Sequence, residues 1–475
     1  MQYRIYTRVM TALAAACLSC AACAVPTTQT PPQPVDPPGQ PSFTHINAGN
    51  KKIYVAWSPV PGADSYTVYY AQANTVTPGS GTPVTGITSP GKMVFGLNNN
   101  ASYSLIVTAV NGAGESPAST VIHGMTDNAW SNCGYARISA GASLHESLAV
   151  APDRTVYLAY TDYANGEKAT VLRFSGTWQA LGGAAFTPHR AFRPSLVVTP
   201  AGTPMLAFAD DGYGSQVTVM TYNGSAWATV GSPGFTPGAA GYENGLQMKL
   251  DPAGTPYVAY ISGNKKASVF RYNGSSWQAV GPADFSPGSS TTLSLDIDSA
   301  GAPCVVTSDG TGLSDKLTVM KYDGSAWGTV GNANFTPGRS FTPRLAIDRL
   351  TDTIYVAFRD ANASSRASVM KFNGTSWFFV GSAGFSPGEI DHLSFALDAG
   401  GTPYCAFADY TATDYALSAM KYSGGSWVSV GAQGFTYAEA WYTSLAIDPQ
   451  GTLYVGYQDR DQMYSVKFQA CVKCF

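Results

Sequence analysis

The sequence predicts an all-β protein, in which a small β-sandwich precedes a seven-bladed β-propeller closed by pairing of its N- and C-terminal strands. Three observations predict this fold class. The composition suits short strands and tight turns, residues 41–126 alternate as strands do, and one motif recurs about every 50 residues from residue 127 onward. Periods of roughly this length are typical of propellers and solenoids.

The composition favours many short strands and restricts the classes of partner. Of the 475 residues, 50 are Gly, 30 are Pro and only 12% are charged. A chain of this length is too long for one domain with a single hydrophobic core, so several domains or a repeat array are expected. The 27 Lys and Arg nearly balance the 30 Asp and Glu, which gives a net charge of −3. No nucleic-acid partner is therefore expected, because nucleic-acid binding needs a basic surface.

Residues 1–22 predict a signal peptide. Arg4 and Arg8 precede an apolar run over 9–18 that is too short to span a bilayer. The sequence Ala21-Ala22-Cys23 resembles the lipobox of bacterial lipoproteins, which implies acylation of Cys23, with Cys20 as the second choice. Residues 23–40 are Pro-rich and predict an extended tether. The protein is expected in the bacterial cell envelope, at the outer membrane or cell surface, attached to the membrane by this lipid alone. Without lipidation it would be secreted.

Residues 41–126 are predicted to form a sandwich of short strands. Alternating runs at 53–57, 65–70 and 103–110 are separated by Gly and Pro clusters. Trp57, the Leu97 and Tyr103 pair and the turn at 111–116 resemble the fibronectin type III family over this whole segment. The resemblance implies that Trp57 lies in the core, that Tyr103 forms a tyrosine corner and that the domain is a spacer or adhesive module.

Residues 127–470 repeat a unit of four short strands, which we term A, B, C and D in chain order. The portion from strand A to strand B resembles the NHL-type propeller repeat. Strand D begins at a tryptophan, and a phenylalanine follows eight residues later. The tryptophans, spaced by 49 or 50 residues, are Trp178, Trp227, Trp277, Trp327, Trp377 and Trp427, and the phenylalanines are Phe186, Phe235, Phe285, Phe335, Phe385 and Phe435. Packing between blades is the expected role of both, and a sugar-stacking site in each blade is the alternative.

The first and last repeats predict how the ring closes. Strands A, B and C occur seven times, but only six D strands follow them. Trp130 lies 17 residues before Ser147, as Trp178 does before Ser195, so an isolated D strand is predicted at the start of the repeats. Its pairing with the last C strand completes a seventh blade and removes two open sheet edges.

The cysteine positions agree with this closure. Cys133 follows the isolated D strand, and Cys471 and Cys474 follow the last C strand, with residues 471–475 expected as a C-terminal tail. Because an exported protein meets an oxidising environment, a disulfide from Cys133 to Cys471 or Cys474 is predicted. Cys304 and Cys405 are expected to be buried thiols.

The loops at one face of the propeller carry the candidate binding residues. The A–B and C–D turns are short and uniform, whereas the D–A and B–C loops differ between blades, with His145 and Glu146 in the first D–A loop. An Asp, or Ser262 once, ends each B strand and is expected to cap the following loop, with calcium binding as the alternative. Aromatic and charged side chains in the variable loops can stack on a sugar and bind its rim. The predicted ligand-binding residues are Phe192, Arg193, Tyr242, Glu243, Arg339, Phe341, Asp391, His392, Trp441 and Tyr442.

The sequence favours a non-catalytic binding protein for carbohydrate recognition or adhesion, with a carbohydrate or a protein as ligand. The alternatives are a protein-interaction scaffold and a glycoside hydrolase or lyase with Glu389, Asp391 and Glu439 as acid–base candidates. No nucleophile elbow and no metal-ligand spacing occur, so neither a cofactor nor a metal is expected. The protein is expected to be a monomer.

Overall fold

The structure is a computed structural model that describes residues 36–241, 245–310, 315–436, 438–460 and 468–475. The predicted signal peptide, Cys20, Cys23 and most of the tether lie outside these residues, as do Tyr242 and Glu243. Strands dominate the described chain, joined by loops and a few single 3-10 turns. Its described part contains no helix long and apolar enough to cross a membrane.

Residues 43–126 form a two-sheet sandwich. One sheet has the order β1 (Phe43–Gly49), β2 (Lys52–Trp57), β5 (Gly91–Phe95). The other contains β4 (Thr82–Ile87), β3 (Ser65–Ala71), β6 (Ala101–Asn111) and β7 (Gly114–Glu115), and β8 (Ile122–Thr126) also pairs with β6. Trp57 and Tyr103 are buried in the same cluster, and the Tyr103 hydroxyl accepts a hydrogen bond from the Asn98 amide at 2.9 Å. The predicted core Trp and tyrosine corner are confirmed.

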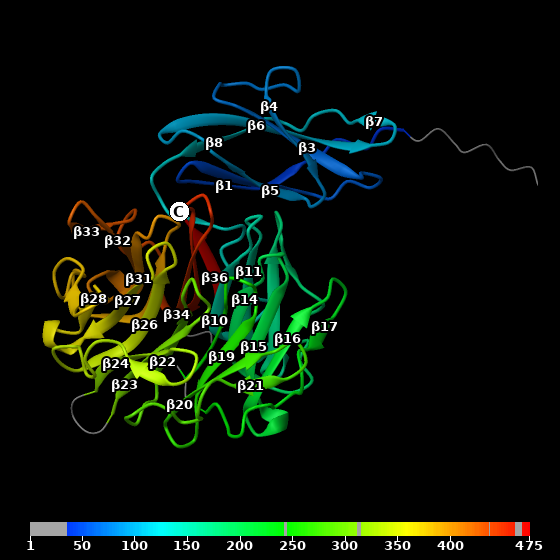
Figure 1. Cartoon of the computed structure of the whole chain (residues 1–475). Helices are drawn as coiled ribbons and strands as arrows, with labels where there is room; N and C mark the ends of the chain where they lie inside the picture. Colours follow the sequence, from blue (N-terminus) through cyan, green and yellow to red (C-terminus); the bar gives the residue numbers. More distant parts are fainter. Residues whose placement is uncertain (1–35, 242–244, 311–314, 437, 461–467) are drawn as a thin grey trace, which may run out of the picture. The chain divides into compact units, whose positions relative to one another are not determined.

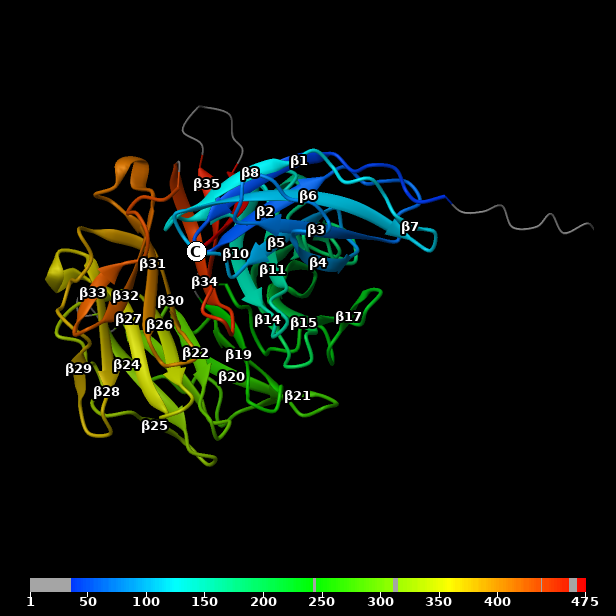
Figure 2. The ribbon, with the colours of Figure 1, turned by 90° about the horizontal axis from the view of Figure 1, so that it is seen from above.

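The repeats form four-stranded antiparallel sheets, each with its strands in chain order. Their first strands pack side by side, in the order β10, β14, β18, β22, β26, β30, β34, and β34 also lies beside β10 (Figures 1 and 2). This arrangement is propeller-like. Six sheets consist of β10 (Ser143–Val150), β11 (Val156–Asp162), β12 (Lys168–Phe174), β13 (Trp178–Ala180); β14 (Ala191–Val198), β15 (Pro204–Asp210), β16 (Gln216–Tyr222), β17 (Trp227–Thr229); β18 (Leu246–Leu250), β19 (Pro256–Ile261), β20 (Ala267–Tyr272), β21 (Trp277–Ala279); β22 (Leu293–Ile297), β23 (Pro303–Asp309), β24 (Lys316–Tyr322), β25 (Trp327–Thr329); β26 (Ser340–Asp348), β27 (Thr353–Asp360), β28 (Arg366–Phe372), β29 (Trp377–Phe379); β30 (Ile390–Leu397), β31 (Pro403–Asp409), β32 (Leu417–Ser423), β33 (Ser426–Ser429).

A further sheet joins the two ends of the repeat region. Its order is β34 (Glu439–Ile447), β35 (Leu453–Arg460), β36 (Phe468–Cys474), β9 (Ser131–Asn132). In the β36–β9 ladder Cys474 lies opposite Ser131. Because β36 pairs with β35 as far as Cys474, the expected C-terminal tail at 471–475 is wrong: all but its last residue belong to the strand.

The tryptophans that begin the D strands connect neighbouring sheets. All but Trp178 stack on a phenylalanine from the preceding sheet, with ring centroids 3.9–4.4 Å apart and interplanar angles of at most 18°. Trp178 contacts Phe174 of its own sheet instead, at 5.2 Å. Trp130 takes part through Phe435, and its indole N–H donates to the Val430 carbonyl at 2.8 Å. The predicted packing role is confirmed for these stacked tryptophans, each of which has one indole face covered by a phenylalanine.

The loops after the B strands are held by the predicted caps. Single 3-10 turns follow four of these strands: η1 (Tyr163–Asn165), η2 (Asp211–Tyr213), η3 (Ala361–Ala363) and η4 (Thr413–Tyr415). Carboxylates accept backbone N–H bonds two residues ahead at Asp210, Asp360 and Asp409, and the Ser262 hydroxyl does the same. The predicted capping is confirmed at these positions but not at Asp162, whose carboxylate accepts from the Asn165 and Thr170 side chains and caps no backbone N–H of η1.

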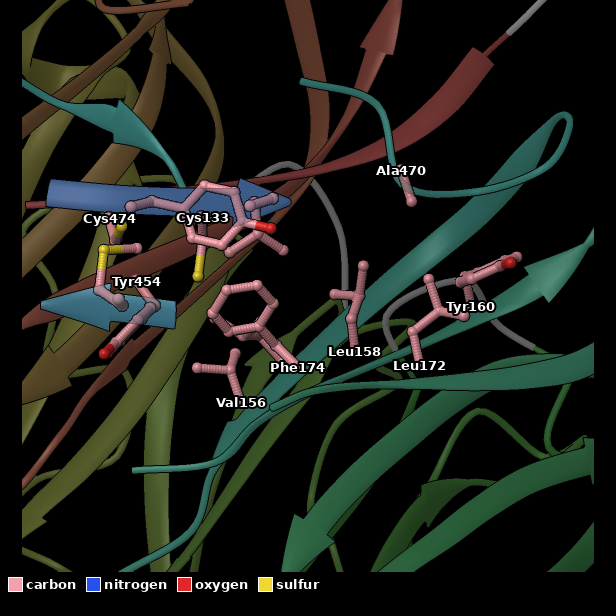
Figure 3. Close-up of a cluster of buried hydrophobic side chains, with 14 residues drawn as sticks. Cys133, Val156, Leu158, Tyr160, Leu172, Phe174, Tyr454, Ala470 and Cys474 are labelled. Carbon is pink, nitrogen blue, oxygen red and sulfur yellow. The ribbon is translucent and has the colours of Figure 1, made fainter. Parts of the chain in front are cut away.

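The five described cysteines are buried thiols, as expected for Cys304 and Cys405. Cys133 and Cys474 belong to one buried cluster with Phe174 and Tyr454 (Figure 3). Cys471 faces the other side of β36 and packs in a different cluster with Trp130. Only Cys474 therefore shares a core with Cys133, and the disulfide stays a prediction.

Candidate functional site

Five A strands begin with the same β-bulge. The strand register shifts at this point in β10, β14, β26, β30 and β34, so that one residue of each bulge has a left-handed backbone. Such a conformation is costly for residues other than glycine and gathers at functional sites. We call these the bulge residues: His145, Arg193, Thr342, His392 and Tyr442, with φ between 46° and 59°.

Three of the bulge residues, His145, Arg193 and Tyr442, line a cavity at the end of the sheets where each D strand leads into the next A strand. This D–A cavity has a volume of about 160 Å³. Its walls come from the first strands of several sheets, so no single blade makes the site. The charged, aromatic and amide side chains in its lining are His145, Glu146, Arg193, Gln247, Arg344 and Tyr442.

Glu146 is the most unusual group in this cavity. Its residue is 6% exposed, and the Ser143 hydroxyl donates to Oε1 at 2.6 Å. The second oxygen, Oε2, is buried and has no hydrogen-bond partner among the described residues. Burial raises the pKa of Glu146 to about 7. Buried acids with such perturbed pKa values are candidates for functional sites.

Glu146 is expected to make stability depend on pH. Below its ordinary pKa of 4.5 the carboxyl is protonated in both folded and unfolded chains, and above about 7 the folded chain must bury a charge. Stability is therefore lost as pH rises through this window, by about 3 kcal/mol. Glu146→Gln removes this loss, so its melting temperature should exceed that of the unmodified protein at pH 8 and not at pH 4.5. Melting curves at both pH values check this, and parallel curves for the two proteins would contradict it.

Aromatic bulge residues meet beside the cavity. The Tyr442 ring lies 4.7 Å from the His145 ring and 5.7 Å from the His392 ring. Trp441 also contacts His392, at 5.3 Å between centroids, and the Arg460 guanidinium lies 4.4 Å from the Trp441 centroid. Of the predicted ligand-binding residues, Arg193 and Tyr442 line the D–A cavity, and His392 and Trp441 lie beside them.

The other predicted binding residues take part in arginine contacts. Arg190 approaches the Phe192 ring, at 5.4 Å from its centroid. Phe341 lies between two guanidinium groups, with Arg339 at 4.9 Å and Arg359 at 5.7 Å. These aromatic faces are partly occupied by the chain itself, and neither phenylalanine lines the D–A cavity.

The carboxylates proposed for acid–base catalysis are held in ion pairs. Arg359 pairs with Glu389 and lies 3.7 Å from an Asp391 oxygen. Glu439 pairs with Arg460 at 3.2 Å and accepts a hydrogen bond from the Trp441 indole at 2.8 Å. All three carboxylates therefore already have an arginine of this chain as a partner.

The opposite end of the sheets has a wider hollow of about 820 Å³, but its polar groups serve the turns. The Asp251, Asp398 and Asp448 carboxylates each accept two backbone N–H bonds from their own A–B turns. These bonds hold the repeated turns, and a purely structural role for this end stays a prediction. Within the described ranges no group of three or more His, Cys, Asp or Glu residues is placed to hold a metal ion.

Sequence reasoning missed Glu146 and Arg344 as site residues. The sequence placed Glu146 in a variable D–A loop without including it among the predicted binding residues. Arg344 belongs to an A strand, which the repeat pattern assigns to packing. The sequence signal for each residue was a difference in chemical type from the residues at the same position of the other A strands. This signal is visible when the seven A strands are compared residue by residue.

Several solved structures resemble this chain at low sequence identity, whereas no curated protein matches it. An α-L-arabinanase from Penicillium chrysogenum is 12% identical, with 61% of this chain and 94% of that chain covered and a TM-score of 0.40. The Aleuria aurantia lectin is 15% identical, with 63% and 99% covered and a TM-score of 0.41. The extracellular domain of a putative one-component system from B. thetaiotaomicron is 11% identical, with 72% and 39% covered and a TM-score of 0.46. These similarities assign no function to this chain. Residues 36–125 match the fibronectin type III domain family, which agrees with the sandwich, its buried Trp57 and its tyrosine corner.

Proposed function

We propose that this is an exported, non-catalytic carbohydrate-binding protein whose seven-bladed, closed propeller presents the D–A cavity as its ligand site. The observation that carries this proposal is the set of bulge residues. They occupy equivalent left-handed positions in five sheets, yet their side chains are imidazole, guanidinium, hydroxyl and phenol. Strain repeated at one end of the sheets, with different chemistry in each copy, suits a site that recognises several groups of one ligand.

A sugar matches the chemistry of the D–A cavity. Sugars present many hydroxyl groups, and the lining offers donors and acceptors from His145, Gln247, Arg193 and Tyr442. The Tyr442 ring supplies an apolar face at the rim. Trp441 is less suitable for stacking than the sequence predicts, since Arg460 and His392 already lie against it.

The N-terminal region fits presentation at a surface. In this proposal Cys23, or Cys20 as second choice, carries the lipid, and the Pro-rich tether and the fibronectin type III domain hold the repeats away from the membrane. Metabolic labelling with a radioactive fatty acid, compared between the unmodified protein and Cys23→Ala, distinguishes lipidation from simple secretion.

The mature chain is expected to bind glycans on an array, and Tyr442→Asn is expected to weaken that binding at least about tenfold, equivalent to 1.4 kcal/mol. Asparagine is chosen because it tolerates the left-handed backbone of this position. Tyr163→Asn is the matched control, because Tyr163 is 55% exposed and does not line the cavity. Dissociation constants from calorimetry on the best glycan check this. A folded chain that binds no glycan, or equal losses in both variants, would contradict the site.

The ion pairs of Glu389, Asp391 and Glu439 support the non-catalytic form of the proposal. Incubation of the protein with oligosaccharides that bind should therefore release no new reducing ends. Release that disappears in Glu439→Gln or Glu146→Gln would favour the hydrolase alternative. A protein captured through the same cavity, with no glycan bound, would favour the scaffold alternative.

A further inference from the structure

A belt of hydrogen bonds joins the first strands of the repeat sheets. In six sheets one equivalent position of the first strand holds Ser or Gln. The side chain at this position accepts a hydrogen bond from a backbone N–H of the next sheet's first strand. Donor–acceptor distances are 2.6–3.0 Å. The accepting residues are Ser147, Ser195, Gln247, Ser294, Ser394 and Ser444.

Arg344 occupies this belt position in the remaining sheet. A guanidinium has no acceptor, so Arg344 cannot receive the N–H of Phe395, the equivalent donor on β30. Its Nη1 donates instead to the Pro343 carbonyl at 3.0 Å, and the side chain lines the D–A cavity. Burial lowers the pKa of Arg344 to about 10. The fold thus loses one bond of the belt and gains a half-buried cation facing the cavity.

Glu146 breaks the repeat at the adjoining position. The other six sheets have Pro, Leu or Thr there, at Pro194, Leu246, Leu293, Pro343, Leu393 and Thr443. Glu146 therefore places a carboxyl where the repeat buries mainly apolar side chains. Departures from a local rule that carry no structural gain are expected at functional positions. Two such departures, one cationic and one acidic, line the same cavity.

We propose that the part of the ligand that enters the D–A cavity is a carboxylate-bearing sugar, with its carboxylate on Arg344 and one of its hydroxyl groups donating to Oε2 of Glu146. This inference rests on the proposed carbohydrate function and specifies its substrate class. A guanidinium binds a carboxylate through two parallel N–H···O bonds, which gives both affinity and orientation. Arg193 lines the same cavity and adds a second cation to it. The unsatisfied Oε2 of Glu146 acquires a partner when the sugar is bound.

The test uses the mature full chain and pairs of glycans that differ only in charge: galacturonate, glucuronate and sialate oligosaccharides, each with its methyl ester. Calorimetry should show at least about tenfold tighter binding of the acid in at least one pair, with an affinity that falls as salt is added. Arg344→Gln should remove this preference, so that the acid and its ester bind with similar affinity. Arg271→Gln, which replaces an exposed arginine away from the cavity, should keep it. Thermal melting of each variant verifies that it folds.

The outcomes separate this inference from the proposed function. Equal binding of acids and esters, or a preference that survives Arg344→Gln, overturns the acidic-sugar inference and leaves carbohydrate binding in place. A folded chain that binds none of these glycans, neutral or acidic, overturns both. Loss of the acid preference in Arg344→Gln, but not in Arg271→Gln, supports the assignment of the carboxylate to Arg344.

Discussion

Oxidised protein is expected to contain a disulfide between Cys133 and Cys474, and its reduction should lower stability by up to about 5 kcal/mol. The two thiols lie in the same buried cluster, and burial raises the pKa of Cys133. The bond would close a loop of more than 300 residues, and loop-closure entropy grows with loop length. With oxidised glutathione as oxidant, each thiol loses one hydrogen, one S–S bond forms between the cysteines, and glutathione disulfide is reduced to two thiols.

Cys471 provides a matched control for this prediction. It lies on the same strand and is equally buried, but its side chain packs in the cluster on the other side of the sheet. Cys474→Ala should abolish the cross-linked peptide on a non-reducing map and make the melting temperature insensitive to reductant. Cys471→Ala should change neither result. A Cys133–Cys471 peptide, or a melting temperature of the unmodified protein that ignores reductant, would contradict the pairing.

Much of the fold can be predicted from the sequence, because each repeat of four strands forms one sheet. A tryptophan that recurs every 49 or 50 residues occupies the same place in each sheet. Trp130 could therefore be assigned to a D strand, although the last C strand lies at the other end of the repeat region. Its stack on Phe435 follows from that periodicity. The boundary of the last strand could not be read in the same way. In the pairing with β35, Cys471 and Cys474 take the places that Ser418 and Lys421 hold in the pairing of β32 with β31, so the last C strand lies later in the sequence than its motif predicts.

The site was harder to predict because it depends on the bulges. An alternating strand places side chains on one face or the other by parity, and an extra residue reverses that parity. Sequence alone therefore does not reveal that Arg193 and Tyr442 line the cavity while their neighbours Phe192 and Trp441 do not. The contacts between arginines and aromatic rings could not be predicted from the sequence either, because the partners can lie on different strands, as Arg460 and Trp441 do.

Trp327→Ala is expected to destabilise the protein by about 3 kcal/mol. The Trp327 ring stacks on Phe285 with centroids 3.9 Å apart and planes within 1°, and its indole N–H donates to the Val280 carbonyl at 2.7 Å. Alanine loses the stack and the hydrogen bond, and it leaves the Val280 carbonyl without this donor. Because the stack joins two sheets, the loss weakens the contact between blades as well as one sheet. Denaturant unfolding followed by tryptophan fluorescence measures the change.

Two further variants separate the parts of this effect. Trp327→Phe keeps an aromatic ring against Phe285 and loses only the indole N–H, so it should cost about 1 kcal/mol. Phe378→Ala removes a ring that is 38% exposed and takes no part in a stack between sheets, so it should cost less than about 1 kcal/mol. If Trp327→Ala were as mild as Phe378→Ala, the stacks would be dispensable, and the recurrence of the tryptophan would need another cause. A sugar-stacking site in each blade would then be the better explanation. A tryptophan that can be removed without loss of stability is not needed for packing, so its recurrence would point to a ligand.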